Sequence, residues 1–194
     1  MTATPALPVV FADANVLYAS APRDILIELA LADIIELRWS HLVLDELCRA
    51  LVRTRPDYTT EKGLRLVAAM TKALPDALVI PPEDQPLNVV LPDPDDAHVL
   101  AAAHHAACDL LLTFNLKHFP ADAVGRLSST IAVSHPDAFI LKLPTTQAAA
   151  VLPVVEAVRQ NLTRPPMSVS DYADNLARCH LTQTADLLRH LLPA

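Results

Sequence analysis

The sequence predicts an α/β sandwich with a central parallel sheet, followed by a helical extension at its C-terminal end. Short apolar runs alternate with helical patterns over the first two-thirds of the chain, and no strand candidate remains after residue 144. Apolar residues make up 52% of the 194 residues, which is enough for a sizeable core. We therefore expect a domain over residues 1–143 and a helical extension over 144–194.

Four short apolar runs are the strand candidates. The first, Val9 to Ala12, ends at Asp13 and is typical of a buried strand. The segment from Ile34 to Trp39 can add a short extended piece. The other three strand candidates run from Leu78 to Ile80, from Asp109 to Thr113 and from Thr130 to Val133.

Helical patterns fill the segments between these strands. Ser20 to Leu31 has a proline early and apolar residues on one face. Ser40 is the expected N-cap of a helix that runs to about Arg53. The remaining predicted helices cover residues 61–74, 93–107, a short stretch ending at 141, and then 147–161, 170–180 and 182–192.

Composition excludes several classes of protein. The chain has two glycines, Gly63 and Gly125, so it lacks the glycine-rich loop of P-loop enzymes and dinucleotide-binding folds. A net charge of −7 disfavours a protein that holds nucleic acid by bulk charge alone. No segment is typical of a membrane span or a secretory signal, and the three cysteines form no metal-binding pair, so we expect a cytoplasmic protein.

Three carboxylates and one amide fall where chemistry is expected. Asp13 and Asn115 follow the first and third predicted strands, and ligands of parallel sheets bind beyond the carboxyl ends of strands. Asp96 starts the alanine-rich helix that leads into the third strand, and Glu46 lies early in the helix after Ser40. Clustered carboxylates stay ionised at little cost when a cation lies between them, and oxygen ligands suit Mg²⁺ or Mn²⁺. Such an ion supports hydrolysis of a phosphodiester.

Each acid also has a simpler interpretation. The run from Asp93 to Asp96 is what a well-capped helix start looks like, and this interpretation is favoured about two to one for these residues alone. Glu46 alone is more often a solvated helix residue. Asp13 is harder to dismiss, because a charge that ends an apolar strand must be solvated, paired or metal-bound.

Four segments, taken in order, resemble the motifs of the PIN-domain ribonucleases. They run from Val10 to Ser20, from Ser40 to Leu47, from Asp93 to Ala103 and from Asp109 to Phe119. The family's acids match Asp13, Glu46 and Asp96, and its fourth position, an Asp or Asn, matches Asn115. The resemblance covers roughly residues 8–142, and the helical tail after Pro144 lies outside the usual small toxin of this family.

The resemblance implies a three-layer α/β/α fold, dependence on Mg²⁺ or Mn²⁺, and cleavage of single-stranded RNA. It makes Asp13, Glu46 and Asp96 the metal ligands and Asn115 a fourth catalytic position, with Asp93 and Asp95 as additional candidates. Many relatives are VapC-like toxins that an antitoxin protein neutralises and that are often dimeric, so both kinds of partner are expected here.

Basic side chains supply candidates for RNA contacts. Arg49 and Arg53 follow Glu46 by three and seven residues, so they share its helix face and can hold phosphates near a metal. A solvated basic face, or a patch that grips an acidic antitoxin, is about equally favoured. Lys117 and His118 are weaker candidates of the same kind. His98 can approach Asp95, but a role other than metal binding is favoured for it.

Two alternatives to a nuclease stay open. A catalytically silent PIN module that binds RNA or protein is suggested by Asn115, which replaces a carboxylate. A phosphatase of the haloacid-dehalogenase type needs a second aspartate two residues after the first, and this chain has Asn15 there. That second alternative is therefore disfavoured.

Overall fold

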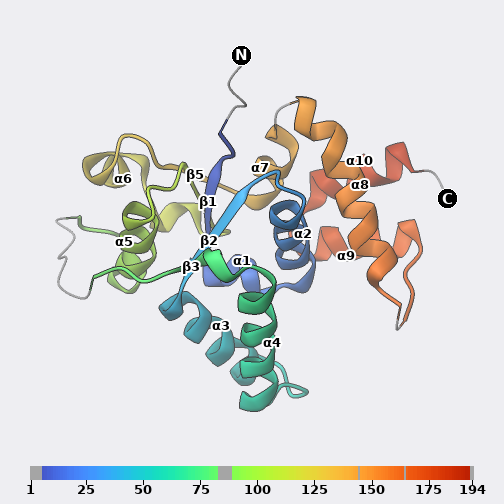
Figure 1. Cartoon of the computed structure of the whole chain (residues 1–194), viewed down its shortest axis with the longest axis horizontal. Helices are drawn as coiled ribbons and strands as arrows, with labels where there is room; N and C mark the ends of the chain where they lie inside the picture. The colour runs from blue at the N-terminus through green and yellow to red at the C-terminus, as the bar shows by residue number, and fades with distance from the viewer. Residues whose placement is uncertain (1–5, 83–88, 144, 164, 193–194) are drawn as a thin grey trace.

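A five-stranded parallel sheet forms the centre of the molecule, with helices packed around it (Figure 1). The structure is a computed structural model, and it describes residues 6–82, 89–143, 145–163 and 165–192. The strands are β1 (Val9–Ala12), β2 (Glu36–Ser40), β3 (Leu78–Val79), β4 (Leu110–Leu112) and β5 (Ala132–Ser134). They lie in the order β3-β2-β1-β4-β5. The predicted α/β/α sandwich with a parallel sheet is confirmed.

The strand order places a natural ligand site at the end of β1. The chain extends the sheet from β1 to β2 and β3 on one side, then returns to add β4 and β5 on the other. β1 therefore pairs with both β2 and β4, with Phe11 opposite Arg38 on one side and Leu111 on the other. Ligands of open α/β sheets bind at the carboxyl end of such a switch in strand order. Asp13 and Thr113 directly follow the two strands that meet there.

Helices cover the sheet and extend beyond it. In Figure 1, α5 and α6 lie to the left of the strands, α3 and α4 below them, and α8 to α10 to the right. The helices of the first part are α1 (Ala14–Tyr18), α2 (Ser20–Leu31), α3 (His41–Thr54), α4 (Thr60–Ala73), α5 (Ala97–His105), α6 (Ala121–Leu127) and α7 (Pro136–Lys142). Three short 3₁₀ turns are η1 (Pro75–Ala77), η2 (Pro94–Asp96) and η3 (Leu116–His118).

Most predicted elements are present, and three differ in an informative way. The extended piece near Trp39 is a full strand, β2, and Trp39 itself is wholly buried. The helix predicted from Asp93 begins later, because Asp93 caps the 3₁₀ turn η2 and the α-helix starts only at Ala97. Helix α6 was not predicted, since its seven residues show no clear apolar period. Ser40 caps α3 as predicted, accepting a hydrogen bond from the backbone N–H of Val43.

The C-terminal helices pack against the sheet domain. They are α8 (Thr145–Asn161), α9 (Val169–Arg178) and α10 (Thr182–Leu191). Helices α8 and α9 contact α2, and α10 contacts α7 (Figure 1). The boundary predicted at residues 143 and 144 stays a prediction, and residue 144 lies outside the described residues. Within the described ranges, no helix combines the length and the apolar character that crossing a bilayer requires.

Candidate active site

Three carboxylates from separate segments line one open pocket at the carboxyl edge of the sheet. Asp13 follows β1, Glu46 lies in α3 and Asp96 ends η2. The pocket has a volume of about 450 Å³. Its lining residues are Asp13, Ala14, Asn15, Tyr18, Glu46, Arg49, Ala50, Arg53 and Asp96. The convergence expected from the sequence is therefore present in the fold.

Asp13 is held in place by two neighbours that also end or follow strands. Its side chain is only 5% exposed, so its carboxylate needs polar partners. The Thr113 hydroxyl donates to Asp13 Oδ2 at 2.7 Å, and the Asn15 side-chain amide donates to the same oxygen at 2.6 Å. Asn15 also donates to Thr113 Oγ1 and accepts from the backbone N–H of Phe114, both at 3.0 Å. This network ties the end of β1 to the end of β4.

The surroundings of Asp13 oppose its negative charge. Burial raises the pKa of its carboxyl above the ordinary 3.8, and the nearby charges of Asp96 and Glu46 raise it further. The hydrogen bond from Thr113 acts in the opposite direction and favours the ionised form. The net effect is a raised pKa, with burial as its largest cause.

Helix α3 brings one glutamate and two arginines to the pocket. Because β2 leads directly into α3, Glu46 lies near the sheet edge, and Arg49 and Arg53 follow on the same face. Glu46 Oε1 lies 2.8 Å from Nε2 of His98, which comes from α5. The approach of His98 to Asp95 that was expected stays a prediction. Among the residues that the structure describes, no carboxylate lies within ion-pair distance of Arg49 or Arg53, so both guanidinium groups can take an anionic ligand.

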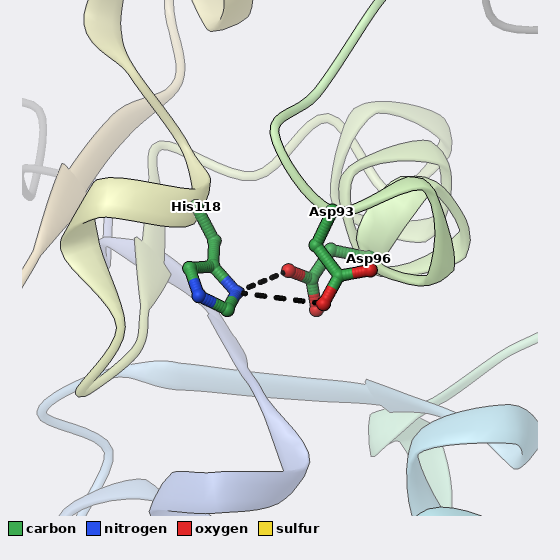
Figure 2. A group of neighbouring side chains, drawn as sticks. All are labelled: Asp93, Asp96 and His118. Atoms are coloured by element: carbon green, nitrogen blue, oxygen red, sulfur yellow. Dashed lines mark hydrogen bonds and ion pairs between the residues drawn. The ribbon is translucent and has the colours of Figure 1, made fainter.

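Asp96 also takes part in a second group of ligand atoms. Figure 2 shows His118 from η3 pointing toward Asp93 and Asp96. His118 Nδ1 lies 2.8 Å from Asp96 Oδ2 and 3.9 Å from Asp93 Oδ2. One ligand atom from each of the three residues can be chosen so that all lie within 4.8 Å of one another. Asp96 is thus shared between the pocket and this group.

Several predicted candidates lie outside the pocket lining. Asn115 is exposed, and its backbone N–H, rather than its side chain, contacts the site by donating to Thr113 Oγ1 at 3.0 Å. Asp95 is exposed and contributes its backbone N–H to the Asp93 cap. Lys117 is exposed on η3. Their roles as ligand or RNA contact stay predictions.

Asn15 and Thr113, which hold Asp13 in place, were not predicted as site residues from the sequence. Both residues lie within the segments that resemble the family motifs. Their position at or just after a strand end was the signal that could have identified them. His98 and His118 gave no comparable signal. They lie 52 and 22 residues from their partners Glu46 and Asp96, so only the fold brings them together.

The donors at this edge fit a divalent cation. Three carboxylates line one pocket, and burial first, then the charges of Asp96 and Glu46, raise the pKa of the Asp13 carboxyl. A cation between the acids would offset both effects. Carboxylate oxygens in small number, with water completing the shell, suit Mg²⁺ or Mn²⁺. Asp13, Glu46 and Asp96 are the residues that could hold such an ion.

Two family models match the chain. The one described as "PIN domain" matches residues 9–117, and the one described as "VapC50 C-terminal domain" matches residues 136–190. A curated protein of Mycobacterium tuberculosis (strain ATCC 25618 / H37Rv), named "Putative ribonuclease VapC50", is 33% identical over 99 residues. The match covers 51% of this chain and 57% of that protein, so it spans little more than half the length of each. The search of solved structures gave no match.

Proposed function

Because the chain belongs to the PIN-domain family, whose model matches residues 9–117, we propose that it is a metal-dependent ribonuclease that cleaves single-stranded RNA internally. The observation that carries the proposal is that Asp13, Glu46 and Asp96 line one pocket together with Arg49 and Arg53, which form no ion pair with any carboxylate of the described residues. The name of the M. tuberculosis relative supports the same activity. The cytoplasm is the proposed compartment, in keeping with three free cysteines.

The proposed chemistry is in-line displacement at a phosphodiester. When bound, Mg²⁺ or Mn²⁺ activates water and stabilises negative charge on a phosphoryl oxygen. Asp13, Glu46 and Asp96 hold the ion, and Thr113 and Asn15 fix the orientation of Asp13 by donating to Oδ2. His98 orients Glu46 in the same way from α5. Side chains fixed by such neighbours keep ligands in productive geometry.

Arg49 and Arg53 are the proposed contacts to RNA. They lie one turn apart on α3 and line the pocket that contains the acids. A phosphate bound by a guanidinium group is fixed by short, charge-assisted hydrogen bonds. Such contacts position the chain without reading its bases, so they suit an RNA held across the carboxylates. Lys117, exposed on η3, is a further proposed contact.

RNA cleavage in the presence of Mn²⁺ tests the proposed site. We expect Asp13→Asn and Asp96→Asn to lower the cleavage rate by at least about 100-fold, because each removes a metal-binding charge. Asp45→Asn is the matched control, since Asp45 neighbours Glu46 on α3 but is exposed and outside the pocket. Equal cleavage by the wild type and all three variants would rule the site out.

The match to the VapC50 C-terminal domain supports a more specific proposal, a toxin of a toxin–antitoxin pair. Such a toxin should arrest growth when expressed alone, and its Asp13→Asn variant should not. The proposed partners are an antitoxin protein and a second copy of the chain. Coexpression with the protein encoded by the neighbouring reading frame should relieve the growth arrest if that protein is the antitoxin. Analytical sedimentation of the purified protein measures whether two copies associate.

A silent PIN module is the second candidate, and one observation favours it. Asn115 stands where a fourth carboxylate is possible, and it lies exposed outside the pocket lining. A silent module should bind Mn²⁺ no more tightly than its Asp13→Asn variant. Calorimetric titration of both proteins with Mn²⁺ distinguishes this candidate from the nuclease.

A further inference from the structure

The group of Asp93, Asp96 and His118 differs from the pocket in its chemistry, because it offers a nitrogen atom beside carboxylate oxygens. The imidazole and the two carboxyl groups come from two 3₁₀ turns, η3 and η2, that lie 22 residues apart in the sequence and face each other in the fold (Figure 2). The three side chains are partly exposed, so water and ions can reach them.

The spacing of the three ligand atoms fits a shared cation. An octahedral ion with ligands at about 2.1 Å has neighbouring ligand atoms about 3 Å apart and opposite ones about 4.2 Å apart. His118 Nδ1 lies 2.8 Å from Asp96 Oδ2 and 3.9 Å from Asp93 Oδ2. Both distances fall close to this range, and all three ligand atoms lie within 4.8 Å of one another.

Hydrogen bonds within the two turns hold the Asp93 side chain and the backbone at His118. Asp93 Oδ1 accepts a hydrogen bond from the backbone N–H of Asp95 at 3.1 Å, which directs the other oxygen, Oδ2, to His118. The backbone N–H of His118 donates to the carbonyl of Asn115 at 2.9 Å, and the next residue, Phe119, is buried in the core. A ligand group fixed in this way loses little freedom when it binds a metal.

We infer that Asp93, Asp96 and His118 form a cation subsite in which His118 supplies a nitrogen ligand and makes the protein favour Mn²⁺ over Mg²⁺. Mg²⁺ strongly prefers oxygen ligands, whereas affinity for an imidazole rises along the first-row transition metals. His118 follows Asn115 by three residues, so an imidazole on the same turn takes over from the carboxylate that position 115 lacks. The inference deepens the proposed nuclease function and rests on it.

Pulsed electron paramagnetic resonance of bound Mn²⁺ tests nitrogen ligation directly, because a coordinated imidazole adds a nitrogen coupling to the spectrum. We expect this coupling in the full-length wild type and its loss in His118→Ala. Calorimetry should show Mn²⁺ affinity falling about tenfold or more in His118→Ala and in Asp93→Asn, with Mg²⁺ affinity falling less than about threefold in His118→Ala. His118→Asp should restore binding with the preference shifted toward Mg²⁺.

His104→Ala is the matched control, since His104 is an exposed histidine on α5 and contacts none of the three residues. It should keep both the nitrogen coupling and the Mn²⁺ affinity. Absence of the coupling in the wild type, or its persistence in His118→Ala, would overturn the inference. Unfolding curves of metal-free His118→Ala and His118→Asp check that both variants are folded.

The outcomes separate this inference from the nuclease proposal. If Mn²⁺ shows the His118 coupling but no RNA is cleaved, the nuclease proposal fails while the subsite stands. If RNA is cleaved through Asp13 and Asp96 with no coupling from His118, the nuclease stands and the subsite fails.

Discussion

At Asp13, the protein keeps a carboxylate where burial and two neighbouring acids oppose its charge. The hydrogen bonds from Thr113 and Asn15 fix its orientation without removing that opposition. Residues arranged for a ligand rather than for stability often carry such a cost, and removing them stabilises the free protein. A substitution at Asp13 therefore tests this cost through the stability of the metal-free protein, without any RNA.

Asp13→Asn should make the metal-free protein more stable at pH 7. The folded-state pKa of Asp13 lies above the ordinary 3.8, so the folded state binds this proton more tightly than the unfolded state. The stability linked to that proton is fully present below 3.8 and is lost as pH rises through the folded-state pKa. Asparagine can still accept from Thr113 and Asn15, so we expect a gain on the order of 1 kcal/mol at pH 7.

Urea unfolding in a chelator at pH 7 and at progressively lower pH measures this difference. The gain should shrink as the pH falls toward 3.8, because Asp13 itself becomes neutral. The Asp45→Asn control should show no such gain at pH 7. A variant that is less stable than wild type at pH 7 would contradict the interpretation that repulsion and burial dominate at Asp13.

Arg49→Ala and Arg53→Ala should each weaken RNA binding in a way that depends on salt. A contact to one phosphate of a single strand contributes about 0.7 to the slope of log affinity against log salt. We expect each substitution to lower the slope by about that amount. Anisotropy of a labelled RNA in the Asp96→Asn background measures it without cleavage. Arg65→Ala on α4, which pairs with Glu61 away from the pocket, should leave the slope unchanged.

At the scale of elements, the C-terminal helices are joined to the sheet domain by polar contacts as well as by packing. The side chain of Asp137 in α7 is 2% exposed and caps α10 from outside that helix. It accepts from the backbone N–H groups of Gln183 and Thr184 at 2.8 and 2.9 Å and from the Thr184 hydroxyl at 2.6 Å.

The turn that ends α9 also reaches the sheet edge, where the ring of His180 lies 5.6 Å from that of Phe114.

Asp137→Ala should lower the free energy of unfolding by about 3 kcal/mol. The substitution leaves two backbone N–H groups and a buried hydroxyl without their acceptor, and each unsatisfied buried donor costs about 1–3 kcal/mol. Thermal or urea unfolding measures the loss. Asp122→Ala is the control, because Asp122 forms only an exposed pair with Arg126 and should cost about 0.5 kcal/mol or less. A loss no larger than that of the control would show that Asp137 does not stabilise α10.

At the scale of the whole molecule, the boundary drawn at residues 143 and 144 need not separate two stable parts. Helix α2 packs on the sheet with one face and against α8 and α9 with another. Burial of that second face stabilises both parts, because apolar surface removed from water lowers the free energy of the folded chain.

A chain that ends after Leu143 should therefore lose cooperative unfolding and bind a hydrophobic dye. It loses the cover over α2, and Asp137 loses the donors that Gln183 and Thr184 supply. Calorimetry and dye fluorescence, compared with the full-length chain, measure both effects. A truncated chain that unfolds in one sharp transition and binds Mn²⁺ normally would show that residues 1–143 form an independent domain.

The local pattern of the sequence was sufficient for the parallel sheet, the cap at Ser40 and the convergence of Asp13, Glu46 and Asp96. Alternating strands and helices favour parallel pairing, and parallel strands end at one edge of the sheet. Asp13 follows a strand at that edge, and Glu46 and Asp96 lie early in segments that begin there, so the three acids lie near one another. At β2 the pattern predicted only a short extended piece from Ile34 to Trp39, because the segment gives no clear periodic signal, whereas the structure has a full strand from Glu36 to Ser40.

Only the tertiary structure decided which side chains touch across long separations. His98 pairs with Glu46 and His118 pairs with Asp96, because the packing of α5 and η3 against their neighbours sets those distances. The sequence correctly places Asn115 after a strand end, but it does not show whether its side chain lines the pocket. In the structure Asn115 is exposed and outside the pocket lining. Periodicity and strand ends are properties of neighbouring residues, whereas contacts between distant segments depend on how the whole chain packs.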